Sequence, residues 1–443
     1  MRCEELAGRS VVVWGAGREG RAAVAELAAR GVRATVALTG VEDVPADLRD
    51  VAVAGPAALD RLAAADVVVK SPGVPHTAPE FLRLRELGVP VTSLTDLWLH
   101  DNAERVVAVT GTKGKSTTAG LVHHLLEATG VPAALVGNGG TPVTVGDRSG
   151  ARVAVAEVSS YQAADLTCSP RVAVVTSLYP EHLPWHGGYE RYVADKLNLV
   201  AHGPEVVVVP DLAGDLADLV AARLSPATRL VDPPELGLAV TDEGLAWSGV
   251  GAVPAGEVAL RGRHNLANLA LALAAVTLLE DGTDRSALLA AAQTFAPLAH
   301  RLEVVPSGDG RVWVDDSLAT APESVVAALE TYADRPVVLL AGGADRGLSF
   351  APLVHYLARR DPAARVSTIA VGPAGARLAR ELDKVRLAPD FATALTWASG
   401  TAQVEVVLLS PGAPSFDEFA SFEERSAAFR AAAGRSSTAP SGR

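Results

Sequence analysis

Residues 105–118 read RVVAVTGTKGKSTT, where an apolar run of β-branched residues meets a turn of glycine, lysine and hydroxyl side chains. The pattern predicts a buried strand that leads into a phosphate-binding loop. Glycines at Gly111 and Gly114 would let the backbone approach a polyphosphate closely. Lys115 would bring positive charge to the β- and γ-phosphates, and the Ser116 hydroxyl would be a ligand for Mg²⁺.

The pattern is a shorter form of the Walker sequence, because Val109 stands where that sequence has its first glycine. Its context strengthens it. Residues 119–129 carry apolar side chains at helical spacing, and Gly130 and Pro132 follow as helix-terminating residues. A strand, a loop and a helix in succession favour a nucleotide site over a plain glycine turn with an exposed lysine.

Length and composition narrow the class of protein. A chain of 443 residues with 49% apolar content predicts about three domains. A net charge of −12 and a pI near 5.4 argue against a sequence-independent nucleic-acid binder. Cys3 and Cys168 have no nearby Cys or His partner for a zinc site. The N-terminus has no signal-peptide pattern, and the longest apolar segment, residues 266–279, is too short to span a bilayer, so we expect a cytoplasmic enzyme.

A second apolar strand, near the N-terminus, leads into Gly15, Gly17 and Gly20 and then an alanine-rich helix. This G-x-G-x-x-G arrangement places a diphosphate at a helix N-terminus. An NAD enzyme would also need an acid at the end of the next strand, but residues 34–38 lack one and Glu42 comes several residues late. The sequence therefore favours another diphosphate ligand.

A further strand, residues 65–70, ends in Ser71, Pro72 and Gly73. The backbone of this turn could meet a ligand at the carboxyl edge of the sheet. A plain Pro-Gly turn explains it equally well.

Polar residues follow two more strands. Glu157 ends an apolar run, and a Mg²⁺ ligand at a strand end would explain a carboxylate there. Glu181, His182 and His186 follow the next strand and could bind metal or nucleotide, although histidines in turns often only donate hydrogen bonds. Lys196 lies in a helical pattern and, by itself, reads as a surface lysine.

The remaining half repeats strand, loop and helix. The segment from Arg261 to Asn268 opens a long helix whose amides could face a purine or cap the helix, and His300 and Arg301 mark a domain join. The repeat predicts a mainly parallel sheet with ligand loops on one edge. The small polar residues from Gly434 onward predict a disordered tail.

Taken together, GTKGKSTT, EVSSYQ, PEHLPWH, Lys196, GRHNLANLALA, HRLE, DDSLAT, GGADRG and SPGAPSFDEFASFEERSAAF resemble the Mur ligases of peptidoglycan synthesis, in the same order along nearly the whole chain. The motifs are most similar to those of members that add glutamate to UDP-N-acetylmuramoyl-L-alanine. The resemblance implies an α/β protein of three domains: a Rossmann-like domain for the UDP-sugar (1–101), a central P-loop ATPase domain (102–298) and a Rossmann-like domain that delivers the amino acid (299–443).

In this family, ATP converts the substrate carboxylate to an acyl phosphate, which the amine of glutamate then attacks. The resemblance implies that Ser116 and Glu157 hold one Mg²⁺, and that His182 and a carbamylated Lys196 serve a second. Asn138 and His182 would lie near the reacting carboxylate, with Lys115 at the phosphates. The other implied sites are, for ATP, Gly111, Thr112, Lys113, Gly114, Lys115, Ser116, Thr117, Asn268, Arg301 and Asp316; for the UDP-substrate, Gly15, Gly17, Gly20, Ser71, Pro72 and Gly73; and for glutamate, Thr320, Arg346, Ser415 and Phe422.

Three positions depart from the usual glutamate-ligase pattern: Lys113 replaces asparagine, and Leu318 and Arg346 each replace a lysine. A guanidinium in place of an ammonium is not conservative at a carboxylate site. With DDSLATAPES and PEHLPWHG, these departures resemble the subfamily that adds L-glutamate, whose product a partner epimerase then converts. We therefore expect L-glutamate, with the D-glutamate enzyme as the alternative.

Other classes fit less well. A nicotinamide oxidoreductase would need an acid after the second strand, which this chain lacks. A folate polyglutamate ligase would not need the N-terminal nucleotide domain. A non-catalytic ATP-binding module would not need Lys115, Ser116, Glu157, His182 and Lys196 together. We expect a monomer that binds neither nucleic acid nor membrane.

Overall fold

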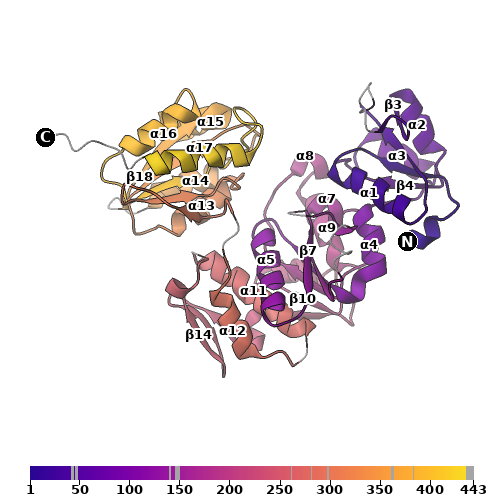
Figure 1. Cartoon of the computed structure of the whole chain (residues 1–443), viewed down its shortest axis with the longest axis horizontal. Helices are drawn as coiled ribbons and strands as arrows, with labels where there is room; N and C mark the ends of the chain where they lie inside the picture. Colours follow the sequence, from indigo (N-terminus) through magenta and orange to yellow (C-terminus); the bar gives the residue numbers. More distant parts are fainter. Residues whose placement is uncertain are drawn as a thin grey trace. The chain divides into compact units, whose positions relative to one another are not determined.

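The computed structural model describes residues 1–40, 44, 48–138, 141–144, 150–260, 262–280, 282–296, 299–360, 364–382 and 384–435. The chain forms two compact units. The first comprises Met1–Pro254 and Ala267–Thr294, and the second comprises Ala255–Leu266 and Phe295–Arg443 (Figure 1).

The first unit begins with a five-stranded parallel sheet in the order β3-β2-β1-β4-β5. This is the order of a Rossmann-type sheet, and its switch point lies between β1 and β4, where ligands of such sheets bind. The strands are β1 (Val11–Trp14), β2 (Ala34–Leu38), β3 (Ala52–Ala54), β4 (Val67–Lys70) and β5 (Val91–Thr92).

Alternate residues of these strands pack on opposite faces, as the two-residue period of a strand requires. Val11 and Val13 join a core with the helices α1 and α4, whereas Val12 and Trp14 join a core with α2 and α3. The helices are α1 (Arg18–Ala29), α2 (Pro56–Ala63), α3 (Pro79–Glu86) and α4 (Leu94–Asn102). The core on the α1 and α4 side continues without a break into the next sheet, which joins both sheets in one unit.

The next sheet has six parallel strands in the order β11-β10-β9-β6-β8-β7. Because β6 lies between β8 and β9, the loops after these three strands converge at one edge. The strands are β6 (Val106–Thr110), β7 (Ala133–Gly137), β8 (Val153–Glu157), β9 (Val172–Val175), β10 (Val206–Val208) and β11 (Arg229–Val231), and the helices are α5 (Lys115–Ala128), α7 (Ser160–Ala163), α8 (Leu183–His186), α9 (Tyr189–Leu197) and α10 (Asp215–Ala221).

A three-stranded antiparallel sheet, which the sequence did not predict, follows the central sheet. Its strands are β12 (Leu238–Val240), β13 (Gly244–Trp247) and β14 (Gly251–Pro254), and α12 (Arg285–Gln293) packs against it. The long helix α11 (Arg263–Leu279) begins in the second unit and continues in the first.

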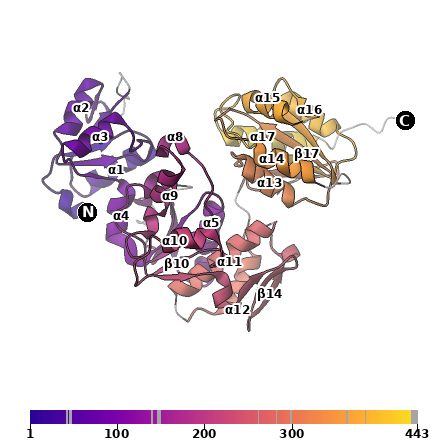
Figure 2. The ribbon, with the colours of Figure 1, turned by 180° about the vertical axis from the view of Figure 1, so that it is seen from behind.

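The second unit holds a six-stranded sheet in the order β15-β16-β20-β17-β18-β19, parallel except for β15. One face packs on α16 and α17 and the other on α13, α14 and α15 (Figure 2). The strands are β15 (Glu303–Val305), β16 (Val312–Asp315), β17 (Val337–Gly342), β18 (Val366–Val371), β19 (Arg386–Leu387) and β20 (Val406–Leu409), and the helices are α13 (Pro322–Glu330), α14 (Ala351–Arg359), α15 (Gly372–Glu381), α16 (Phe391–Gly400) and α17 (Phe422–Arg435).

The predicted α/β class with mainly parallel sheets is confirmed. The domain limits at 101 and 298 stay predictions, and Leu298 lies outside the described residues, as do Glu42, Arg261 and the tail from residue 436. Within the part of the chain that the structure describes, no helix combines the length and the apolar character needed to cross a membrane.

Candidate active site

The loop between β6 and α5 has a steric need for its two glycines. Gly111 has φ 144° and Gly114 has φ 86°, a region that favours glycine. A Cβ atom on Gly111 would lie 2.0 Å from Thr176 Oγ1, and one on Gly114 would lie 2.6 Å from Asn268 Oδ1. The loop is therefore packed closely between β9 and α11, and the amide of Asn268 covers Gly114.

Two lysines converge on this loop. Lys115 Nζ donates to the carbonyl oxygens of Gly111 at 2.9 Å and Thr112 at 3.0 Å, and Lys196 Nζ donates to Gly111 O at 2.8 Å. Lys115 opens α5, and Ser116 and Thr117 follow it in the first turn. The N-cap is Gly114 and makes no side-chain cap, so the first N–H groups of α5 can face an anion.

Lys196 is a buried lysine, not the surface residue that its helical pattern indicated. The residue is 2% exposed, and its Nζ lies 5.2 Å from the centroid of the Tyr192 ring. Burial, and then the charge of Lys115, lower its pKa well below the ordinary value. A neutral amine is the form that reacts with CO₂, so the environment fits a carbamate.

Glu157 ends β8 and is buried at 4% exposure. Its Oε1 accepts a hydrogen bond from Asn138 Nδ2 at 3.0 Å, and its carbonyl oxygen accepts from Asn138 N at 2.9 Å. The structure thus brings two predicted site residues together across neighbouring strands β7 and β8. Carboxylate and hydroxyl oxygens are the ligands that Mg²⁺ prefers, so Glu157 and Ser116 fit that ion.

Glu181, which the sequence offered with His182 and His186 as a candidate for binding metal or nucleotide, lies between two basic side chains. Its Oε1 lies 3.0 Å from Lys113 Nζ, and its Oε2 lies 3.9 Å from His182 Nε2. Burial would raise the pKa of Glu181, but Lys113, His182 and Lys115 together hold it below its ordinary value. The sequence did not predict this ion pair, in which the carboxylate balances the charge of Lys113 beside the phosphate loop.

The two histidines of this segment differ in exposure: 37% for the side chain of His182 and 0% for that of His186. His182 has φ 56° at the start of α8, and its ring lies 5.0 Å from that of Tyr161. His186 is buried, and its two ring nitrogens contact Asp195 Oδ2 at 2.7 Å and Ser160 Oγ at 3.0 Å. His186 therefore supports the fold, and of the two histidines His182 fits the metal or nucleotide role.

The predicted diphosphate turn lies at the switch point of the N-terminal sheet. Gly15 follows β1 and Ser71 follows β4, and a Cβ on Gly20 would lie 2.1 Å from Gly15 O and 2.9 Å from Ser71 Oγ. A Cβ on Gly17 would meet no atom within 4 Å. The carbonyl oxygen of Gly73, which follows Pro72, accepts a hydrogen bond from Trp185 Nε1 at 3.2 Å. Gly15 itself has φ 100°, and a Cβ on it would lie 2.9 Å from Ser71 Oγ, so glycine is required at Gly15 and Gly20 but not at Gly17.

Helix α1 also reaches the residues around Glu157. Arg18 Nη2 donates to the carbonyl oxygen of Asn138 at 2.7 Å, and Glu19 Oε1 accepts from Gln162 Nε2 at 2.7 Å. Burial raises the pKa of Glu19 to about 7. The diphosphate turn and the surroundings of Glu157 are therefore connected by direct hydrogen bonds.

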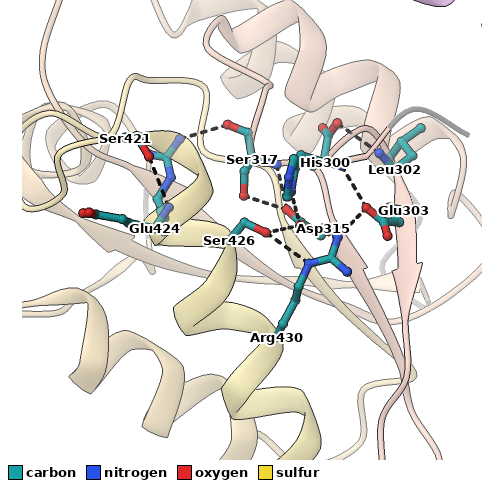
Figure 3. Close-up of polar contacts among 11 residues, drawn as sticks. His300, Leu302, Glu303, Asp315, Ser317, Ser421, Glu424, Ser426 and Arg430 are labelled. Atoms are coloured by element: carbon teal, nitrogen blue, oxygen red, sulfur yellow. Dashed lines mark hydrogen bonds and ion pairs between the residues drawn. The ribbon is translucent and has the colours of Figure 1, made fainter.

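In the second unit, Asp315 is the centre of a polar cluster (Figure 3). Its Oδ2 contacts His300 Nδ1 at 2.9 Å and Arg430 Nη2 at 3.1 Å, and its Oδ1 accepts from Ser317 Oγ at 2.6 Å. Ser426 Oγ also donates to Oδ2. The cluster holds the end of β16 against the turn that carries Arg301 and against helix α17.

Arg301 and Asp316, both predicted at ATP, lie next to this cluster. Arg301 stands between His300 and Leu302, which have φ 63° and 46°, a backbone conformation that is rare outside glycine. Asp316 accepts hydrogen bonds from Ser410 Oγ at 2.7 Å and Leu302 N at 3.3 Å. Burial raises the pKa of Asp316 to about 7, against the opposing effects of Ser410 and Arg301.

Two of the four predicted glutamate residues line a common hollow beside the carboxyl ends of β16, β17 and β20. These two are Thr320 and Arg346. Ser415 is buried and follows Pro414, which lines the same hollow. Phe422 begins α17 and packs its ring edge-on against His300 at 5.5 Å, and it does not line the hollow.

Two family descriptions match the chain: the Mur ligase middle domain over residues 109–227, and the Mur ligase glutamate ligase domain over residues 300–413. The chain is 44% identical to the UDP-N-acetylmuramoyl-L-alanine–L-glutamate ligase of a Micromonospora species, covering 97% of each chain. It is 45% identical to the protein of that name from Salinispora tropica, covering 97% of this chain and 98% of the other.

Among solved structures, MurF ligase from Thermotoga maritima in complex with ADP resembles the chain with a TM-score of 0.62 at 17% identity, covering 97% of this chain and 96% of that one. A bifunctional folylpolyglutamate synthase/dihydrofolate synthase from Yersinia pestis gives a TM-score of 0.57 at 19% identity, covering 72% of this chain and 90% of that one. The folds agree, and the full-length relatives set the family: the chain belongs to the Mur ligases.

Proposed function

We propose that this protein is an ATP-dependent ligase that joins L-glutamate to UDP-N-acetylmuramoyl-L-alanine in peptidoglycan precursor synthesis. The observation that carries the proposal is the convergence of Lys115, Lys196 and Glu157 on the loop edge of the central sheet. The near-full-length relatives named above for this reaction support the choice of substrates.

In the first step, an oxygen of the substrate carboxylate attacks the γ-phosphorus of ATP. A new oxygen–phosphorus bond forms, the bond to the β-phosphate oxygen breaks, and ADP leaves. Lys115 and the first N–H groups of α5 stabilise the negative charge on the transferred group. Mg²⁺, bound by Ser116 and Glu157, would neutralise further phosphate charge.

In the second step, the amine of glutamate attacks the acyl carbon and forms a tetrahedral oxyanion. The carbon–oxygen bond to phosphate then breaks, phosphate leaves, and the amine loses its proton to give the amide. Asn138 and His182 would orient the reacting carboxyl group, and a carbamate on Lys196 would, with His182, provide ligands for a second Mg²⁺.

The remaining assignments follow the same scheme. Gly15, Gly17, Gly20, Ser71, Pro72 and Gly73 would bind the UDP-substrate, and Thr320, Arg346, Ser415 and Phe422 the glutamate. ATP would be held by residues 111–117 with Asn268, Arg301 and Asp316. The domains would be 1–101, 102–298 and 299–443, in a cytoplasmic monomer whose product an epimerase converts.

Isotope transfer tests the reaction class. UDP-N-acetylmuramoyl-L-alanine with ¹⁸O in its carboxylate is incubated with ATP, Mg²⁺ and L-glutamate, and the released phosphate is analysed by mass. An acyl phosphate leaves one labelled oxygen in each phosphate. Product formed with unlabelled phosphate would contradict the mechanism, and Lys115→Ala should abolish release whereas exposed Lys384→Ala should not.

A further inference from the structure

The guanidinium group of Arg377 bonds to residues on both sides of Arg346. Arg377, on α15, donates to Asp345 Oδ2 through Nε at 3.0 Å and to Asp345 Oδ1 through Nη2 at 2.9 Å. The same Nη2 donates to the carbonyl oxygen of Leu348 at 2.6 Å. Residues on both sides of Arg346 and Gly347 are thus tied to a single side chain.

Further contacts stiffen this turn, residues 345–348. Gly347 N donates to Asp345 Oδ1 at 2.8 Å within the turn. The guanidinium carbon of Arg377 lies 4.7 Å from the centroid of the Phe350 ring, so its plane is supported from beneath. A forked, planar guanidinium with two bonds to one carboxylate fixes direction as well as distance.

The chain before the turn is held equally closely. Ala344 N donates to the carbonyl oxygen of Pro414 at 2.9 Å, and a Cβ on Gly343 would lie 2.1 Å from that oxygen. The turn therefore leaves β17 at a fixed point, and Arg377 sets the course that it follows.

The turn borders the hollow that Thr320 and Arg346 line. The residues that line it include Arg346, Arg377 and Thr320. Asp345, the acid of the lining, is already bonded to Arg377, so the lining favours an anionic ligand.

Arg346 differs from Arg377 in its hydrogen bonding. It is exposed, and among the described residues no hydrogen bond or ion pair engages its guanidinium. Arg346 can therefore bind a carboxylate, and the turn that carries it is held in place. Selection between enantiomers requires both properties. If Arg346 could move freely, it could bind the α-carboxylate of either enantiomer. A fixed turn prevents this, so the enantiomer whose carboxylate lies elsewhere is bound poorly.

We propose that Arg377 is a positioning residue that determines which enantiomer of glutamate is used. Through Asp345 and Leu348 it holds the turn so that Arg346 meets the α-carboxylate of the L-enantiomer in a productive position. The inference rests on the proposed glutamate-ligase function and deepens it.

The test compares L-glutamate with D-glutamate in the full-length enzyme. Arg377→Lys keeps the charge and removes the fork, Arg377→Met removes both, and Asp345→Asn weakens the acceptor. Glu381→Gln is the matched control, because Glu381 contacts Arg377 at 3.6 Å from outside the turn. The measurements are kcat and KM for both enantiomers, KM for ATP, and the thermal unfolding temperature.

We expect Arg377→Lys and Arg377→Met to lower the ratio of kcat/KM for L- over D-glutamate about tenfold or more, mainly through KM for L-glutamate. KM for ATP should stay within about twofold, and the control should keep the wild-type ratio. If Arg377→Met does not fold, Arg377→Lys and Asp345→Asn carry the test.

An unchanged ratio in variants that fold would overturn the inference and leave Arg377 a structural clamp. That result differs from failure of the proposed function, in which the wild-type enzyme turns over neither enantiomer; the inference would then fall with it.

Discussion

Lys196 Nζ donates a 2.8 Å hydrogen bond to the carbonyl oxygen of Gly111, 85 residues earlier in the chain. A buried lysine from α9 thus lies against the loop that would bind the phosphates of ATP. Because burial lowers its pKa, the side chain is placed for chemistry that a surface ammonium could not perform.

Lys196→Ala should therefore reduce kcat by about two orders of magnitude or more, because a metal-binding carbamate can no longer form. Short carboxylates added to the assay should restore part of the rate, and depleting CO₂ should slow the wild-type enzyme. Lys384→Ala, an exposed lysine substitution, is the control. Unchanged turnover in Lys196→Ala would rule out the carbamate role.

The glycines of the N-terminal turn should respond differently to alanine. Gly20→Ala places a Cβ 2.1 Å from backbone oxygen, so we expect a loss of about 1–3 kcal/mol in the free energy of unfolding. Gly17→Ala meets open space at φ −67°, and stability should stay within about 1 kcal/mol. Denaturant unfolding measures both; equal effects would show that the packing at Gly20 is wrongly described.

Glu19 should make stability depend on pH. Its pKa is about 7 in the folded protein against an ordinary 4.5, so the folded state binds more protons between these values and stability falls as pH rises through that window. Glu19→Gln should remove this loss, at most about 3 kcal/mol, and gain stability over wild type from pH 5 to pH 8. The apparent unfolding temperature checks this, with exposed Glu190→Gln as control. A difference that is constant with pH would refute the expectation.

Arg18 should influence the Mg²⁺ requirement from outside the metal site. It holds the carbonyl of Asn138, whose amide in turn bonds to Glu157. Arg18→Met should raise the Mg²⁺ concentration for half-maximal rate about tenfold, as loss of such supporting contacts does. Arg21→Met is the matched control, because Arg21 is also exposed, lies on the same helix and donates to Ala16 O. The same Mg²⁺ dependence in both variants would contradict the link.

The sequence predicted those features that local pattern specifies. The strand before the phosphate loop, the glycine turns and the alternation of strands and helices are local, and the parallel sheets confirm the class. Helix α5 begins at Lys115, earlier than the apolar pattern starting at Ala119 indicated, because a helix that opens on a phosphate loop has a polar first turn. The sheet β12–β14 was missed because its strands are short and most residues of β12 and β14 are exposed or half-buried, so they lack the continuous buried run of the equally short β1 and β4.

What escaped prediction depends on contacts between distant residues. Nothing near Lys196 in sequence shows that it is buried against Gly111. The pairing of Glu181 with Lys113, and the contacts of Glu19 and Arg377, likewise have no local signal. Their partners are brought together by the order of the strands, which pairing in three dimensions decides. The resemblance supplied the roles of the predicted residues, whereas the structure shows which of them meet.

The measurement that tests the central claim most directly is product formation from UDP-N-acetylmuramoyl-L-alanine, ATP and Mg²⁺, run in parallel with L-glutamate and with D-glutamate and followed by product mass and phosphate release. The account predicts amide product and stoichiometric phosphate with L-glutamate, and a much slower reaction with D-glutamate. Turnover with D-glutamate alone, or with neither enantiomer, would contradict it.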